Sequence, residues 1–199
     1  MDTATIFNTI KDHFKEYKNV ENVEMEMRLG KFNGTFFDTN IGKEKYDFLM
    51  RALQKYDGWE KIINTNTEVF YRSNDGMRMS IDEDTGEEKI IIKKNIKKFD
   101  FTSDPYDVRF STSYETPVEV CDREMDKRKT KNRVSFIRKN LSIDMTVCTG
   151  DGEDMDSEEV NTYQVEFEII DPKKIGDDTT LFNAIHKVKD LLKVFGQHS

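Results

Sequence analysis

The chain has 199 residues, of which 36% are hydrophobic and 35% are charged, and its formal net charge is -8 at pH 7. This length fits one domain with a substantial core, so we expect a single domain over residues 1–199. An acidic chain is poorly suited to coating a nucleic-acid backbone, which requires a basic surface. The three histidines are scattered along the chain, which argues against zinc or Ser-His-Asp triad chemistry. No apolar run approaches membrane-spanning length and the first residues do not resemble a signal peptide, so we expect an intracellular protein that is not secreted.

Three segments have apolar residues at helical spacing. They are an N-terminal helix at about residues 3–18, a second helix over residues 43–56, and a C-terminal helix at about residues 180–195. In the second segment the apolar positions include Leu49 and Leu53, which lie on one face of a helix. These helices are expected to flank the remainder of the fold.

Most of the chain between these helices is predicted to form short strands. Six segments are rich in strand-forming residues and bounded by turn residues, namely residues 67–71, 77–81, 89–92, 108–115, 132–137 and 142–147. With helices at both ends and strands between them, the chain is expected to be an α+β protein.

Two further strands, at residues 24–28 and 164–168, alternate acidic and apolar side chains. Because successive side chains of a strand point to opposite faces, Glu24 and Glu26 share one face, as do Glu166 and Glu168. If the two strands were neighbours, four carboxylates would converge, and such a cluster is stable only around a cation. This predicts a metal site. The alternative is two half-buried strands whose acidic faces meet water.

The other strands carry cations on their polar faces. These cations are Arg78, Lys94, Arg109, Lys131 and Arg133. Asp144 and Thr146 occupy the polar face of a nearby strand. In a closed antiparallel barrel such faces would line a polar lumen, with acids to hold a divalent cation and bases to hold a polyanion such as triphosphate.

Hydrolysis of a phosphoanhydride needs this mixture of charges, because negative phosphates repel an attacking water until cations neutralise them. Carboxylates suit Mg²⁺ or Mn²⁺, which also contact substrate phosphates directly. A further carboxylate must orient the water, and Glu115 is a candidate. The alternative role for Glu115 is a simple ion pair.

Taken in order, these segments resemble the tunnel-type, metal-dependent RNA 5′-triphosphatases of fungal and DNA-virus mRNA capping systems, within the triphosphate tunnel metalloenzyme superfamily. The resemblance extends over roughly residues 21–170. It is carried by residues 24–30 (EMEMRLG), 78–80 (RMS) followed by the Thr85-Gly86 turn and Lys94, 106–108 (YDV) followed by Glu115, 131–135 (KNRVS), 143–146 (IDMT) and 165–169 (VEFEI).

The resemblance implies a closed eight-stranded antiparallel β-barrel, the triphosphate tunnel, whose strands span about residues 21–170 between flanking helices. The implied ligands of Mg²⁺ or Mn²⁺ are Glu24, Glu26 and Glu168. The implied phosphate-binding residues are Arg78, Lys94, Lys131 and Arg133. Glu115 and Glu166 would position the attacking water. The supporting residues would be Arg28, Arg109, Asp144 and Thr146. Gln164 departs from the family pattern, in which fungal members often carry a third Glu.

The implied reaction removes the γ-phosphate of 5′-triphosphate RNA to leave a diphosphate end, which is the first step of mRNA capping. Nucleoside triphosphates are expected as further substrates, and a fused or separate guanylyltransferase as a functional partner, in the nucleus, cytoplasm or virion. Two alternatives remain open. One is an inorganic tripolyphosphatase, or another small-triphosphate hydrolase, on the same tunnel fold, and the other is a non-catalytic polyphosphate-binding domain.

Overall fold

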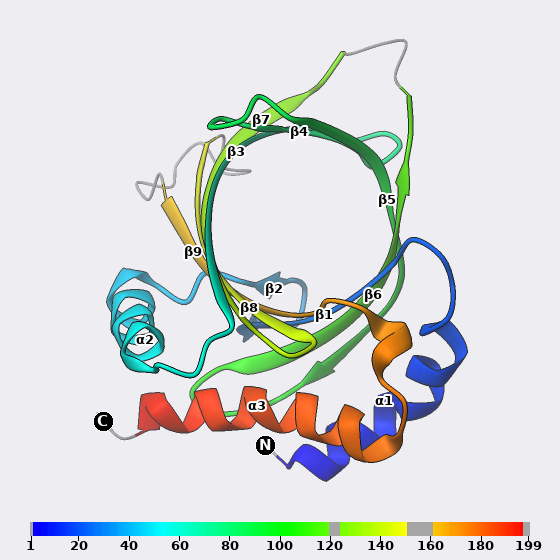
Figure 1. Ribbon diagram of the computed structural model, residues 1–199. Coiled ribbons are helices and arrows are strands. Elements are labelled where there is room, and N and C mark those ends of the chain that lie inside the picture. The colour runs from blue at the N-terminus through cyan, green and yellow to red at the C-terminus, as the bar shows by residue number, and fades with distance from the viewer. Residues whose placement is uncertain (1, 120–123, 151–160, 197–199) are drawn as a thin grey trace.

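A barrel of antiparallel strands is the centre of the molecule, as the computed structural model shows for residues 2–119, 124–150 and 161–196. These residues form nine strands, and all but β2 (Phe37–Asp38) close into the barrel (Figure 1). The barrel strands are β1 (Val23–Phe32), β3 (Lys61–Arg72), β4 (Met77–Asp82), β5 (Glu88–Phe101), β6 (Asp107–Pro117), β7 (Lys127–Arg138), β8 (Leu141–Gly150) and β9 (Asn161–Ile169). The predicted α+β fold with a closed eight-stranded barrel is confirmed.

The barrel closes where the first and last strands meet. β1 pairs with β6 on one side and with β9 on the other, and both pairings are antiparallel. The register of the β1–β9 pair sets Glu26 opposite Glu168 and Arg28 opposite Glu166. Directly opposed residues point to the same face of a sheet. The two acidic strands are therefore neighbours, which meets the condition for their carboxylates to converge, and their charged residues share the lumenal face.

Three α-helices, α1 (Thr3–Tyr17), α2 (Lys43–Lys55) and α3 (Asp178–Gly196), lie on one side of the barrel (Figure 1). Side-chain caps explain where two of them begin. Asp2 accepts a hydrogen bond from the Ala4 amide at the start of α1, and Asp177 accepts one from the Thr180 amide at the start of α3. Such caps satisfy amides that have no partner within the helix. All three helices were predicted.

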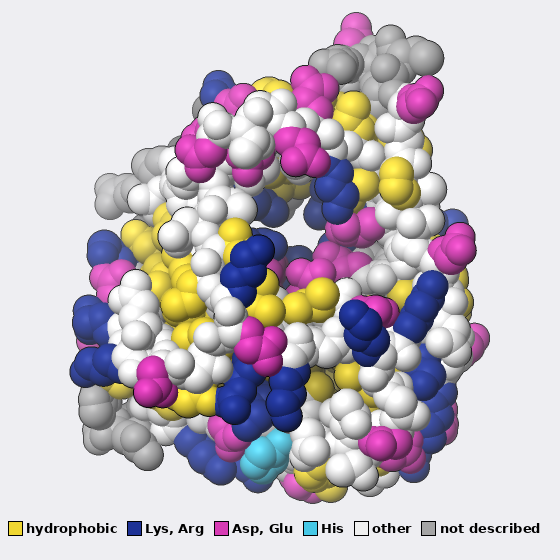
Figure 2. Space-filling model, viewed as in Figure 1, with side chains coloured by type: hydrophobic (Ala, Val, Ile, Leu, Met, Phe, Trp, Pro, Cys, Tyr) yellow, Lys and Arg dark blue, Asp and Glu magenta, His cyan; other side chains and the backbone are white. Residues whose placement is uncertain are grey.

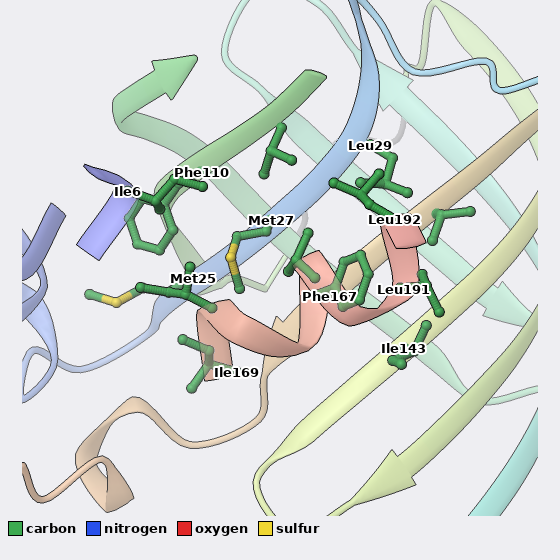
Figure 3. Packing of buried hydrophobic residues seen from close by; sticks show 14 of the residues in the cluster. Ile6, Met25, Met27, Leu29, Phe110, Ile143, Phe167, Ile169, Leu191 and Leu192 are labelled. Carbon is green, nitrogen blue, oxygen red and sulfur yellow. The ribbon is translucent and has the colours of Figure 1, made fainter. Parts of the chain in front are cut away.

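The hydrophobic core lies outside the barrel, between its floor and the helices (Figure 3). Met25 and Met27 of β1 are fully buried there, together with Phe110 of β6 and Phe167 of β9. Helix α1 contributes Ile6 to the same cluster. Because the outward faces of β1, β6 and β9 carry this apolar packing, strand alternation turns their polar faces toward the lumen.

The barrel strands extend beyond their predicted bounds, and β3 and β5 do so most. β3 begins at Lys61 rather than residue 67, because its polar start pairs with β7 from Lys61 opposite Ile137 onward. β5 continues to Phe101 rather than ending at residue 92, and a register shift between Asn95 and Lys97 interrupts its pairing with β6. A bulge of this kind disturbs the alternation on which strand prediction depends.

Among the described residues, no helix combines the length and the apolar character that crossing a membrane requires.

Candidate active site

The lumen of the barrel is lined by charged side chains of both signs. Figure 2 shows an opening through the molecule with Lys, Arg, Asp and Glu side chains around it. The charges come from alternate residues of the strands, since the intervening residues face outward. Most of the acidic members lie on β1, β6, β8 and β9, the strands that form the floor above the hydrophobic core.

Arg28 connects two buried carboxylates in this floor. Its Nη2 atom lies 2.8 Å from Glu26 Oε1 and 3.0 Å from Glu166 Oε1. Ser111 on β6 also donates a hydrogen bond to Glu26, at 3.2 Å. Burial raises the pKa of Glu26, and Arg28 only partly opposes this. Arg28 thus holds two strands' carboxylates together at the closure of the barrel.

Arg133 on β7 makes three separate contacts with the floor. It donates from Nη2 to Glu166 (2.8 Å), from Nη1 to Asp144 (3.1 Å) and from Nε to the Thr146 hydroxyl (3.0 Å). Burial alone would raise the pKa of Glu166, but Arg28 and Arg133 together lower it to about 2. Asp144 and Thr146 therefore lie against an arginine whose guanidinium is fixed at three atoms.

Lys94 does not face the lumen, and this corrects its predicted place in the site. It is exposed and lies opposite Tyr114, whose strand face is turned away from the tunnel. The neighbouring Lys93 lies opposite Glu115 instead. Its ammonium contacts the Glu24 carboxylate and lies 3.1 Å from Glu115 Oε1, and its side chain is only 8% exposed. Of these two neighbouring lysines, Lys93 is therefore the one that faces the lumen.

Glu115 forms ion pairs with two lysines of β5. Besides Lys93, the Lys89 ammonium lies 3.6 Å from its other carboxylate oxygen. Burial acts to raise the pKa of Glu115. The combined attraction of Lys93 and Lys89 outweighs burial, so the pKa is lowered. Glu24 is held similarly, by Lys93 and by a 2.8 Å hydrogen bond from Ser113. Both carboxylates thus contact Lys93 at the lumenal surface.

The three predicted metal ligands lie on one lumenal face, but they do not form a ready-made coordination shell. Among the described residues, no three His, Cys, Asp or Glu side chains are placed to hold a metal ion. Glu24 contacts Lys93 and Glu26 contacts Arg28, whereas Glu168 has neither a hydrogen bond nor an ion pair from its side chain within the described chain. Burial, with Asp144 and Glu24 nearby, raises the pKa of Glu168 to about 7.

The remaining predicted residues lie farther along the lumen. Arg78 of β4 stacks over the Tyr71 ring, at 5.3 Å from its centroid. Lys131 of β7 is half-buried and has no ion pair within the described residues. Arg109 of β6 lies opposite Arg28 and donates to both oxygens of Asp100 on β5, at 2.6 and 2.8 Å.

Sequence reasoning missed Lys93 and two serines, Ser111 and Ser113. The serines share the lumenal face of β6 with Glu115, and each donates to a carboxylate of β1. The sequence did contain a signal for the two serines. Alternate residues of a strand share a face, so Ser111 and Ser113 belong to the same face as Glu115.

A family model described as "mRNA capping enzyme, beta chain" matches residues 43–198. The chain belongs to this capping enzyme beta-chain family. The match begins after β1, so the placement of Glu24 and Glu26 beside β9 comes from the structure rather than from the family model. No curated protein sequence matches the chain significantly.

Solved structures share the fold of this family member. The S. pombe Pct1 RNA triphosphatase superposes with a TM-score of 0.74 at 18% identity, over 96% of this chain and 91% of that one. Pct1 in complex with the Spt5 CTD gives a TM-score of 0.72 at 19% identity, with the same coverage of 96% and 91%. The Mimivirus capping enzyme triphosphatase gives 0.63 at 16% identity, over 95% of this chain and 97% of that one.

Proposed function

We propose that this capping enzyme beta-chain family member is an RNA 5′-triphosphatase, which hydrolyses the γ-phosphate of triphosphate-ended RNA to leave a diphosphate end. Family membership supports this reaction, and so does the fold shared with two proteins that are RNA or capping triphosphatases. The observation that carries the proposal is the closed lumen in which Arg28, Arg133 and Lys93 are all fixed by buried or half-buried carboxylates.

These fixed cations suit a phosphoryl group in the transition state. Cations held in place before the reaction stabilise developing negative charge without reorganising during it. Arg133 is held by three groups and Arg28 by two, so neither must give up rotational freedom when phosphate oxygens arrive. Arginine also binds phosphate through paired hydrogen bonds that lysine cannot reproduce.

A divalent cation fits the acidic part of this lumen. Glu26 and Glu168 are directly opposed on β1 and β9, and Glu24 shares their face two residues earlier on β1. Carboxylate oxygens are the donors that Mg²⁺ and Mn²⁺ prefer. These three residues would hold the ion, which when bound would neutralise phosphate charge and orient the substrate. Glu168 forms no ion pair within the described residues, which leaves its carboxylate available to a cation and supports this assignment.

The attacking water would be oriented by carboxylates that stay ionised. Glu115 and Glu166 each form ion pairs with two cationic side chains, and each faces the lumen. Oxygens held in this way can accept a hydrogen bond from water and direct its lone pair at the γ-phosphorus. The diphosphate end would then be the substrate of a guanylyltransferase in the same or another chain.

The proposal is tested by phosphate release from triphosphate-ended RNA and from inorganic tripolyphosphate, each with Mg²⁺, with Mn²⁺ or with a chelator. We expect RNA hydrolysis that depends on the divalent ion. Glu26→Gln should weaken Mn²⁺ binding in a direct titration as well as lower turnover. Hydrolysis of tripolyphosphate without hydrolysis of RNA would contradict the proposal and favour the small-triphosphate alternative.

A further inference from the structure

A basic pocket of about 290 Å³ lies at one mouth of the tunnel, beside the turn between β3 and β4. Tyr71, Arg78, Lys127 and Lys129 line it. The strand register sets Tyr71 opposite both Arg78 and Lys127, so these residues belong to one continuous part of the wall. The stacked Arg78 and Tyr71 give the pocket a flat π surface next to its positive charges.

A line of cations joins this pocket to the active site along β7. Its members are alternate residues on one strand face, namely Lys127, Lys129, Lys131 and Arg133. All four are half-buried, whereas Arg128 and Asn132 between them are exposed. At about 3.4 Å per residue the line is roughly 20 Å long. Its inner end is Arg133, which contacts Glu166.

The cations of the line and the pocket differ in whether a carboxylate neutralises them. Arg133 at the inner end is paired with carboxylates. In the described part of the chain, Lys129, Lys131 and Arg78 form no ion pair. Neighbouring positive charges repel one another unless an anion lies among them. A triphosphate bound next to Arg133 would leave Lys129 without an anionic partner in the described part of the chain, so an anion that extends beyond the triphosphate fits the line better.

The opposite mouth carries the opposite charge. The turn from β4 to β5 lies there and bears five acidic residues, namely Asp82, Glu83, Asp84, Glu87 and Glu88. Figure 2 shows Asp and Glu side chains gathered above the opening, at the top of the barrel where Figure 1 labels β3, β4 and β7. A polyanion is repelled from this mouth and attracted to the basic one.

We propose that the RNA chain leaves the active site along β7 through the basic mouth, and that its first nucleotides occupy the pocket. Backbone phosphates contact Lys129 and Lys131, and a base stacks on the Arg78–Tyr71 pair, as bases do on arginine and aromatic planes. This inference rests on the proposed triphosphatase function. It explains how an acidic protein recognises an RNA end, because the contact is confined to a few phosphates inside a basic channel.

The salt dependence of KM tests the phosphate contacts. Lys129→Gln is compared with Arg128→Gln as the control. Arg128 is the neighbouring residue on β7, faces outward and pairs with Glu68. For a short triphosphate-ended oligonucleotide, losing one single-strand phosphate contact should reduce the slope of log KM against log salt by about 0.7. The slope for tripolyphosphate should stay as in the wild type, and Arg128→Gln should change neither. An equal change for both substrates in Lys129→Gln would overturn the proposal, because the lysine would then belong to the triphosphate site.

Photocrosslinking tests the direction of the chain. A triphosphate-ended oligonucleotide with a photoreactive uridine at its second nucleotide should crosslink to residues 71–78 or 127–129. Crosslinks to residues 82–88 would place the RNA at the acidic mouth and overturn the inference. Failure of the proposed function would show itself separately, as a wild-type protein that releases no phosphate from the same oligonucleotide.

Discussion

Arg133→Lys removes the planar guanidinium that joins β7 to the floor of the tunnel. In the wild type three different nitrogens donate, to Glu166, Asp144 and Thr146. A lysine side chain ends in a single ammonium nitrogen, which cannot occupy the positions of three guanidinium nitrogens. We therefore expect at least one of the three contacts to be lost. Because Asp144 and Glu166 are buried, a lost charge-assisted hydrogen bond there costs about 1.5–3 kcal/mol.

Most of this cost should fall on catalysis. Removing one preorganised electrostatic element lowers turnover by about 10²–10³-fold. We therefore expect kcat/KM for triphosphate-ended RNA to fall by roughly that factor, which corresponds to about 2.7–4 kcal/mol of lost transition-state stabilisation. The assay is steady-state phosphate release, accompanied by urea unfolding to measure any loss of fold stability.

Arg128→Lys is the matched control. Arg128 lies on the same strand, but it is exposed and pairs with Glu68 on the outer face. We expect wild-type kinetics from this variant, because exposed ion pairs contribute at most about 1 kcal/mol. Wild-type kcat/KM in Arg133→Lys would refute the reasoning, since positive charge alone would then suffice at this position.

Three further predictions concern the two neighbouring lysines of β5, two glycines in turns, and the pH dependence of the free energy of unfolding. Lys93→Gln should lower kcat/KM by about tenfold or more, whereas Lys94→Gln should retain activity, and the reverse result would return Lys94 to the lumen. Gly76→Ala should lower the free energy of unfolding by about 1–3 kcal/mol, because φ is +76° and a Cβ would lie 2.5 Å from the Lys93 carbonyl oxygen. Gly86→Ala, at φ +72° with nothing within 4 Å, should cost less in the same urea titration, and equal losses would argue against the steric contact. Burial lowers the pKa of His13, so the unfolded chain binds its proton first, near pH 6.5. The stability due to neutral His13 is therefore present above about pH 6.5 and lost as the pH falls below it, and His13→Gln should flatten this part of the unfolding profile. An unchanged profile in the variant would exclude His13 as its source.

Local rules were sufficient to predict the helices and the two acidic strands. The caps at Asp2 and Asp177 and the periodic apolar residues depend only on near neighbours in sequence. The alternation around Glu26 and Glu168 likewise assigns a face to each side chain without any tertiary information. Because the outward faces carry the apolar core, the lumenal position of these carboxylates followed from the pattern.

Alternation could not decide between Lys93 and Lys94. Cations occupy both faces of β5 over residues 93–98, and the register shift between Asn95 and Lys97 changes the face of every residue beyond it. The ion pairs of the lumen were also beyond sequence reasoning. Whether Arg28 contacts Glu166 depends on the closure of β1 against β9, two segments almost the whole chain apart.

The most direct test of the central claim is to identify the bond that is cleaved. Triphosphate-ended RNA labelled at its γ-phosphate is incubated with the protein and Mg²⁺ or Mn²⁺, and both products are resolved. We predict that the label is released as inorganic phosphate while the RNA retains a diphosphate end. Release of the label as pyrophosphate, with a monophosphate RNA end as the first product, would contradict the account.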